Sequence, residues 1–237
     1  MSEQPTTSEP PPQAPPRQRW RLVVARGPDA PAAAQRDVAQ AWLAAIEASG
    51  LPLAHTEGAR TRPRIAFGAP LPVGMAADAE LIDVVLTERR PAWDVRSALL
   101  ANLPDGWRLI DLFDVWLAGP ALPGRVAAAD YRITLAPGVD SAPVVTAARA
   151  LLDSRSILRE RPKGGGTVRY DLRPLLIDVH VADPGPPPIL TVRTRFHPEL
   201  GSGRPEEVVA ALGERLGRVV EVEAIVRERL ILTDDLD

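Results

Sequence analysis

The chain has 237 residues and a net charge of −3, and 45% of its residues are hydrophobic. This composition is ordinary for a globular protein, and so small a net charge does not favour broad attraction to nucleic acid or membranes. The chain contains no cysteine, which excludes disulfides, thiolate nucleophiles and cysteine-held iron–sulfur clusters. No apolar run approaches the ~20 residues of a transmembrane helix, and no hydrophobic signal segment is visible, so we expect a cytoplasmic protein without membrane contact.

The first part of the chain shows the pattern of an α+β fold. Residues 1–18 are rich in proline and lack core-type residues, which predicts a disordered tail. From residue 19 to residue 118, strand-like and helix-like segments follow one another in the order β-α-β-β-α-β. This is the order of the split-βαβ, ferredoxin-like arrangement. The expected strands are 20–25, 62–68, 80–86 and 107–117, and the expected helices are 33–49 and 93–103.

The second part, residues 130–237, repeats this plan with one additional hairpin that has a glycine-rich tip. Residues 119–129, rich in proline, glycine and alanine, are expected to connect the two parts. In the first helix of the second part, the spacing of Val145, Ala148 and Leu152 predicts a buried face. The expected strands are 131–135, 157–161, 168–172, 175–181, 189–195 and 219–232, and the expected helices are 142–152 and 204–216. We therefore predict two tandem ferredoxin-like halves with antiparallel sheets.

One long segment resembles a known family. Residues 50–74, GLPLAHTEGARTRPRIAFGAPLPVG, are similar to the signature of the radical SAM-linked protein family. Its members are domains of unknown function that occur alone or fused to B12-binding radical SAM proteins. Three later segments also resemble motifs of that family, and the resemblance covers residues 20–215. These segments are 79–86, 170–175 and 193–212.

The resemblance implies an accessory protein that acts with a radical SAM enzyme in trans. Because three thiolates are needed to hold the cluster of a radical SAM enzyme, this cysteine-free chain is not itself such an enzyme, and we expect it to carry no cofactor. Two stretches depart from the family pattern. Asp37 is the one residue within 32–37 that matches the family's run there, and residues 59–61 also differ.

Arginines recur at every second position in several strand-like segments. Side chains with this spacing share one face of a strand, and rows of arginine are surfaces to which phosphate backbones bind. We therefore expect RNA binding as one function of these rows, with an ordinary solvated strand face as the alternative. The rows are Arg60, Arg62 and Arg64, then Arg159, Arg161 and Lys163, then Arg193 and Arg195.

Further binding candidates lie at turns. His55 and Glu57 fall in the turn of the signature segment. Arg204 follows a Gly-Ser-Gly sequence at the start of an expected helix, where free amides can bind an anion. The three histidines of the chain lie on different segments without the spacing of metal ligands, so we expect no metal site.

Catalytic candidates are few, and three functions stay open. Asp171 and Arg173 lie two residues apart and are expected to pair, and Asp37 is a further acidic candidate. The first function is a non-catalytic accessory role beside a radical SAM enzyme, contributing to RNA or substrate binding. The second is an RNA-modifying or other enzyme with its site near residues 50–74 and Asp171. The third is a protein-interaction module alone.

Overall fold

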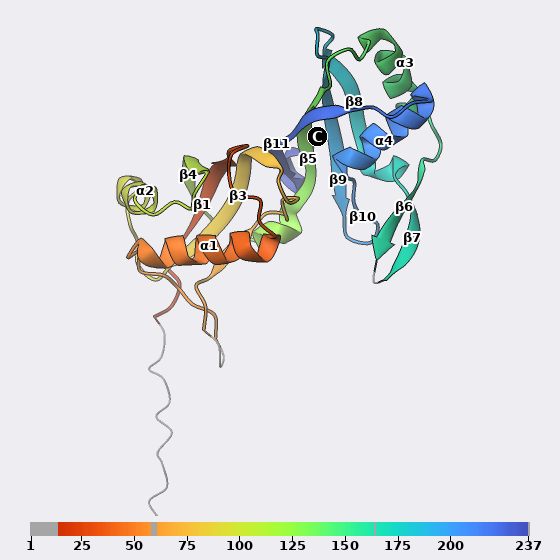
Figure 1. Ribbon diagram of the computed structural model, residues 1–237. Helices are drawn as coiled ribbons and strands as arrows, with labels where there is room; N and C mark the ends of the chain where they lie inside the picture. Colours follow the sequence, from red (N-terminus) through yellow and green to blue (C-terminus); the bar gives the residue numbers. More distant parts are fainter. Residues whose placement is uncertain (1–13, 58–60, 164, 237) are drawn as a thin grey trace, which may run out of the picture.

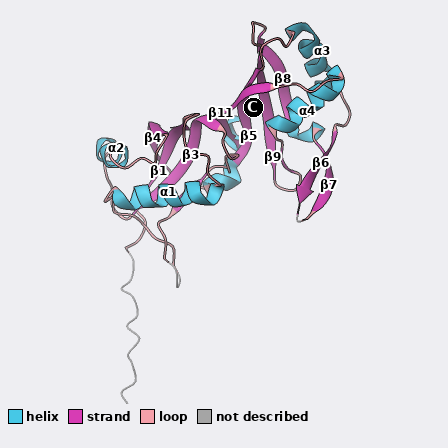
Figure 2. Ribbon diagram, viewed as in Figure 1, coloured by secondary structure: helices cyan, strands magenta, loops and turns pink. Residues whose placement is uncertain are grey.

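A computed structural model of the chain describes residues 14–57, 61–163 and 165–236 (Figure 1). It confirms the predicted α+β class. A nine-stranded sheet, antiparallel at all but one of its strand pairs within the described residues, runs through two halves that each carry their own helices (Figure 2). No helix within these ranges is both long and apolar enough to cross a membrane.

The first half contains six elements in the expected sequence. They are β1 (Gln18–Arg26), α1 (Gln35–Ala48), β2 (Ile65–Phe67), β3 (Ala76–Leu86), α2 (Ala92–Leu100) and β4 (Trp107–Val115). The strand order is β4-β1-β3, with β2 on the outer side of β3, and these neighbours are antiparallel. Trp42 and Ile46, four residues apart on α1, belong to one buried core with Leu22 of β1, as the helical spacing requires.

The second half follows a related strand order with an inserted hairpin. Its elements are β5 (Val126–Leu135), α3 (Ser141–Leu152), β6 (Leu158–Lys163), β7 (Gly166–Asp171), β8 (Leu176–Asp183), β9 (Ile189–His197), β10 (Gly201–Ser202), α4 (Pro205–Leu216) and β11 (Val222–Leu232). The order across its sheet is β8-β9-β5-β11, all antiparallel, and β6 and β7 form a separate two-stranded sheet. Short 3-10 turns lie at Leu122–Arg125, Arg173–Leu175 and Thr233–Asp235.

The two halves share one sheet through β11. Figure 1 shows β11, in blue, between β5 of the second half and β3 of the first. The contact with β3 is parallel and short: Val226 lies opposite Ala76 and Arg227 opposite Ala77. Only the beginning of β3 is available to β11, because Ile65–Phe67 of β2 pairs with the later residues of β3 on the same edge.

The signature segment crosses from one half to the other. Its part before residue 68 builds β2 in the first half, whereas Ala69, Leu71 and Met75 are buried in the core of the second half. Gly68 lies at the crossing, where an added Cβ would lie 2.6 Å from Leu230 Cδ1. A side chain at this position would therefore displace the Leu230 side chain of β11.

Several boundaries differ from the expected ones. The tail expected at 1–18 ends earlier, since Arg17 donates its amide to Leu86 and Gln18 is buried in β1; residues 1–13 lie outside the described residues. The connector expected at 119–129 is partly a strand, because Val126–Leu135 forms β5 and pairs with β9 and β11. In α3 the buried face is one residue earlier than expected, on Val144, Ala147, Ala148 and Leu151.

Candidate functional site: a cavity between the two halves

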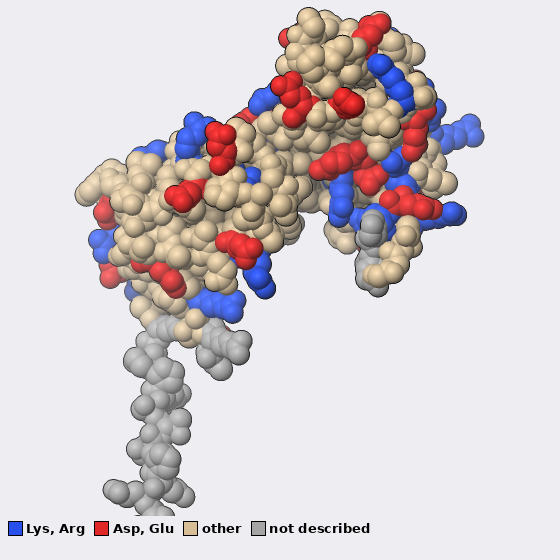
Figure 3. Space-filling view, in the orientation of Figure 1, with Lys and Arg blue, Asp and Glu red and all other residues tan. Residues whose placement is uncertain are grey.

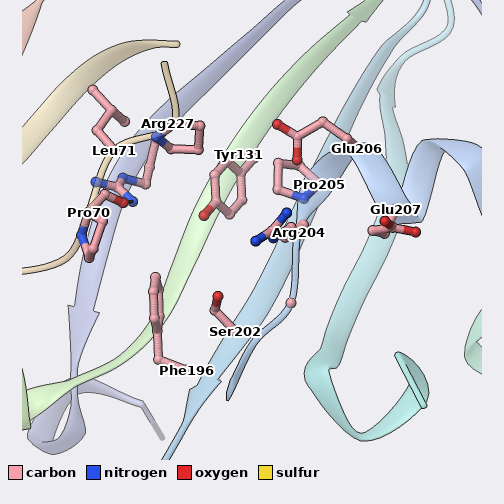
Figure 4. A pocket seen from close by; sticks show the side chains of 12 residues that line it. Pro70, Leu71, Tyr131, Phe196, Ser202, Arg204, Pro205, Glu206, Glu207 and Arg227 are labelled. Atoms are coloured by element: carbon pink, nitrogen blue, oxygen red, sulfur yellow. Dashed lines mark hydrogen bonds between the residues drawn. The ribbon is translucent and has the colours of Figure 1, made fainter. Parts of the chain in front are cut away.

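A cavity of about 520 Å³ lies where the signature segment meets the second half. Residues 70–72 form its wall on the side of the first half, and β5, β9, β11 and the start of α4 supply the remainder. Figure 4 shows the side chains of Tyr131, Phe196, Arg204 and Arg227 around one space, each from a different element. The signature segment thus contributes residues 70–72 to a cavity that is otherwise built by the second half.

Tyr131 of β5 forms the floor of this cavity. The residue is 3% exposed, and its hydroxyl points into the space beside Arg204 and Arg227 (Figure 4). Burial raises the pKa of the Tyr131 phenol above 10.0, and the charge of Arg227 opposes this shift only in part. The phenol therefore keeps its proton at neutral pH, and a ligand in the cavity would meet it as a hydrogen-bond donor or acceptor.

Arg227 of β11 is fixed in place by Glu80 of β3. Its Nε donates to Oε1 of Glu80 at 2.6 Å, and a second nitrogen donates to the other carboxylate oxygen. The guanidinium also donates to the backbone oxygen of Pro70 at 2.9 Å. Because Glu80 neutralises its charge, Arg227 holds residues 69–70 against the second half and shapes the cavity, while adding little net charge to it.

Arg204 is the exposed cation of the cavity. It precedes Pro205, the first residue of α4, and it forms no ion pair with any described carboxylate. The amide of Gly203 is already donated to the backbone oxygen of Arg195 at 3.0 Å. Because this amide is already occupied, an anion at the start of α4 would be bound mainly by the Arg204 side chain.

Acidic residues near the start of α4 limit the anionic ligands that the cavity can accept. Glu206 and Glu207 both line it. The carboxylate of Glu207 accepts a hydrogen bond from Nε of Arg159 at 2.8 Å, and Arg159 also pairs with Glu214, so one guanidinium serves two carboxylates. Figure 4 shows Glu206 above Pro205, on the side of Tyr131 away from Phe196. The half of the cavity between Arg204 and Phe196 is therefore the part that favours a negative group.

Phe196 and Ser202 complete the lower wall. Ser202 of β10 lies opposite Phe196 of β9 in their short ladder. The Phe196 ring is half-buried and presents one face to the cavity (Figure 4). An aromatic face, a hydroxyl and an unpaired guanidinium therefore surround the same space, which is a combination able to hold a planar polar ligand with a negative group.

The structure separates the predicted arginine rows. Arg62 and Arg64 are exposed, and Arg60 lies outside the described residues. Nε of Arg193 donates to Asp130 at 2.7 Å and Nε of Arg159 donates to Glu207, so both arginines are engaged in ion pairs within the protein. On the face that Figure 3 shows, basic and acidic side chains are interspersed, and no continuous basic stripe is visible.

The acidic candidates and their neighbours perform structural tasks. Oδ1 of Asp171 accepts the amides of Ile157 at 2.8 Å and of Arg173 at 2.9 Å. Burial raises the pKa of Asp171, but these hydrogen bonds outweigh it and hold the pKa below 3.8. Arg173 donates in turn to the backbone oxygens of Leu152 and Leu176, so the expected pairing of Asp171 with the Arg173 side chain is replaced by backbone contacts.

The other predicted residues lie apart from the cavity. Asp37 is exposed in the first turn of α1, 3.6 Å from Arg36. His55 donates through Nδ1 to the backbone oxygen of Leu53 at 3.1 Å, and Glu57 is exposed. Arg195 is half-buried on β9. In the described part of the chain, no cluster of three or more histidine, aspartate or glutamate residues is arranged to hold a metal ion.

Sequence reasoning identified Arg204 but missed Tyr131, Phe196 and Arg227. One signal for Arg227 was present: it is a charged residue inside the apolar strand IVRERLIL, where an inward-facing charge requires a buried partner. Tyr131 and Phe196 carried no comparable signal, because aromatic residues in strands are usually core residues.

Comparison with known proteins gives a family and a distant structural neighbour. No curated protein matches the sequence. One solved chain, in the "Crystal Structure of a Cbf5-Nop10-Gar1 Complex", is similar with a TM-score of 0.47 and 10% sequence identity; 88% of this chain is covered. The alignment spans 49% of that neighbour, about half of its length. Residues 19–208 match the model of DUF2344, described as an uncharacterized protein conserved in bacteria, and the chain therefore belongs to this family.

Proposed function

We propose that this protein is a non-catalytic RNA-binding partner of a radical SAM enzyme, and that the cavity between its halves receives one nucleotide of a single strand. The observation that carries this proposal is the placement of Arg204 and Phe196 in one open cavity. A nucleotide combines a phosphate with a planar base, so it needs a cation and a flat surface close together.

The remaining lining residues suit this ligand. The volume of about 520 Å³ lies in the range of small-molecule sites. The Tyr131 hydroxyl and Ser202 offer hydrogen bonds to a ribose or to a base edge. Stacking on an aromatic ring contributes about 1–3 kcal/mol per base without strong sequence preference. We therefore expect modest affinity and little sequence selectivity for a single cavity of this kind.

The accessory role follows from the chemistry that the chain lacks. Without cysteine it cannot hold the cluster of a radical SAM enzyme, so that chemistry belongs to another chain. The association itself rests on the resemblance of the signature segment to radical SAM-linked proteins. It predicts that a radical SAM enzyme encoded beside this protein binds it in a pull-down experiment; the absence of binding to such an enzyme would remove this part of the proposal.

RNA titrations at low and moderate salt test the cavity. Arg204→Ala should weaken binding of a short unstructured RNA by at least about tenfold and reduce the salt slope by about one contact. Phe196→Leu should weaken binding with the salt slope unchanged, because it removes stacking and no charge. Tyr131→Phe should have a smaller effect, since it removes one hydroxyl from a buried ring.

Arg218→Ala supplies the matched control. Arg218 is an exposed arginine beyond the other end of α4, so this change removes the same charge outside the cavity. If Arg204→Ala and Arg218→Ala weaken binding equally, attraction is diffuse and the cavity is not the site. If the wild type binds no RNA at low salt, the RNA function is wrong.

A further inference from the structure

A second cavity, of about 290 Å³, lies on the first half against β1, β2 and β3. Its polar lining comes from Arg19 of β1, Asp83 of β3, and Thr56 and Arg64 of the signature segment. Residues 117–121, which follow β4, close one side of it. None of these residues lines the cavity between the halves.

The wall of this second cavity contains an unbalanced buried charge. Nε of Arg19 and Nε of Arg21 each donate to the carboxylate of Asp83 at 2.8 Å. The side chains of Arg19, Arg21 and Asp83 are 8%, 8% and 2% exposed. Neither guanidinium has a second carboxylate within 4.0 Å among the described residues. Because two buried guanidinium groups share one carboxylate, one positive charge stays without a carboxylate partner and is poorly hydrated. Such a charge favours the binding of an anion.

Arg64 adds a second positive charge at the opening. Its side chain is exposed and forms no ion pair with a described residue. Thr56 lies beside it, and its hydroxyl oxygen accepts the amide of Arg62 at 3.1 Å, which leaves the hydroxyl hydrogen available to a ligand. Arg19 and Arg64 therefore line this cavity beside one carboxylate, that of Asp83. Arg21 lies outside the lining but shares Asp83 with Arg19, so the local surplus is two positive charges.

The buried part of the cavity is fixed before any ligand arrives. Besides its bonds to Asp83, Arg19 donates to the backbone oxygens of Gly119 at 3.0 Å and Pro120 at 2.9 Å. Gly119 has little free space, because an added Cβ would lie 3.1 Å from the backbone oxygen of Trp116. Arg19 thus contributes a fixed charge, while Arg64 and Thr56 contribute free donors.

We propose that this cavity binds a phosphate monoester or free phosphate. A phosphate monoester carries a charge of about −1.5 to −2 at neutral pH, which matches the surplus of two positive charges better than a carboxylate does. Arg64 donates to its oxygens as a fork, Thr56 donates its hydroxyl, and the fixed charge of Arg19 stabilises the ligand from the cavity wall. The site is independent of the RNA site, since the two cavities share no lining residue.

Calorimetric titrations of the full-length protein at low ionic strength test the site with three probes. These are inorganic phosphate, glycerol 3-phosphate and glycerol, none of which has a base that could stack on Phe196 in the other cavity. Arg64→Ala should weaken phosphate binding by at least about tenfold, because a charge-assisted hydrogen bond is lost. Thr56→Val should weaken it by a smaller factor. Arg204→Ala should leave it unchanged, which distinguishes this site from the proposed RNA site.

Arg62→Ala is the matched control. Arg62 is an exposed arginine two residues from Arg64, but it lines a different cavity, beside α1. Binding of phosphate alone would assign the site to the free ion, and tighter binding of glycerol 3-phosphate would assign it to a phosphate on a larger molecule. Binding of glycerol, equal losses in Arg62→Ala and Arg64→Ala, or no phosphate binding by the wild type would each overturn the proposal. Arg64→Gln, with the melting temperature as a check on folding, replaces Arg64→Ala should that variant misfold.

Discussion

Arg227 of β11 and Glu80 of β3 form an almost wholly buried ion pair, with side chains 1% and 7% exposed. The pair lies beside the two-residue ladder that joins the sheets of the two halves. It connects residues 147 positions apart in the sequence and, through Pro70, the signature segment as well. The junction of the halves is therefore both a sheet contact and a buried electrostatic contact.

The first prediction concerns this pair. Arg227→Leu should lower the free energy of unfolding by about 3–5 kcal/mol, because it leaves the Glu80 carboxylate buried without a partner. The double variant Glu80→Leu/Arg227→Leu should recover much of that loss, since no charge then stays buried. Urea denaturation of both single variants and the double variant measures the coupling. A double variant as unstable as the sum of the single changes would show that the two residues do not depend on each other.

The second prediction concerns cooperativity between the halves. All five tryptophans belong to the segment from Trp20 to Trp116, so tryptophan fluorescence reports mainly on unfolding of the first half, with Trp107 also touching the core of the second. Ala69, Leu71 and Met75 extend from the first half into the core of the second, and we expect the halves to unfold together. Leu190→Ala, in β9 of the second half, should therefore lower the fluorescence-detected midpoint as much as the midpoint seen by circular dichroism. Two separate transitions would contradict this expectation.

The third prediction concerns Gly203, which precedes Arg204. An added Cβ at Gly203 would lie 2.8 Å from both Leu175 O and Thr194 Cβ, so β9 or the start of α4 must move. Gly203→Ala should cost about 1–3 kcal/mol of stability, as overpacking does, and should weaken RNA binding by displacing Arg204. Gly124→Ala is the control, because its Cβ meets nothing within 4 Å. We expect the control to change stability by less than about 0.5 kcal/mol.

The fourth prediction concerns Asp130, which accepts hydrogen bonds from Arg193 and Arg229. Burial raises its pKa, but these two arginines outweigh burial and hold the pKa below 3.8. A carboxyl with a lowered folded pKa stabilises the protein above its unfolded pKa of about 3.9, and this stabilisation is lost as the pH falls through the folded value.

Melting temperatures at pH 7, 5 and 3 test the sign of this effect. The wild type should exceed Asp130→Asn by a constant margin at pH 7 and 5. The margin should shrink at pH 3, because below about pH 3.9 the carboxyl of the unfolded chain gains a proton that the folded carboxyl, with its lowered pKa, resists. A margin that grows on acidification would contradict the assigned direction of the pKa shift.

The sequence predicted the elements well where hydrophobic spacing was unambiguous. In α1 the spacing of Trp42, Ala45 and Ile46 leaves one apolar face, and those residues are buried. In α3 the apolar residues occur as doublets, such as Val144 with Val145, so two faces are equally apolar. The packing of α3 against β8 determines which of the two faces is buried, and the periodicity of the sequence does not contain this information.

The candidate site was less accessible to sequence reasoning, because it depends on contacts between distant segments. Arg204 had a local signal in the Gly-Ser-Gly sequence before it. Tyr131, Phe196 and Arg227 converge because β5 pairs with both β9 and β11, and no local pattern specifies these pairings between distant strands. The alanine-rich start of β3 was missed for the same reason, since Ala76 and Ala77 carry weak strand propensity and are placed by their partner.

Because translation is directional, β11 is made after every other strand of the sheet. While the ribosome is still elongating, the start of β3 has an unpaired edge and the Glu80 carboxylate has no guanidinium partner. The first half is therefore made before the strand that covers the start of β3, and an unpaired strand edge is a surface on which another chain can pair. The synthesis of β11 covers this edge and gives Glu80 its guanidinium partner in a single step.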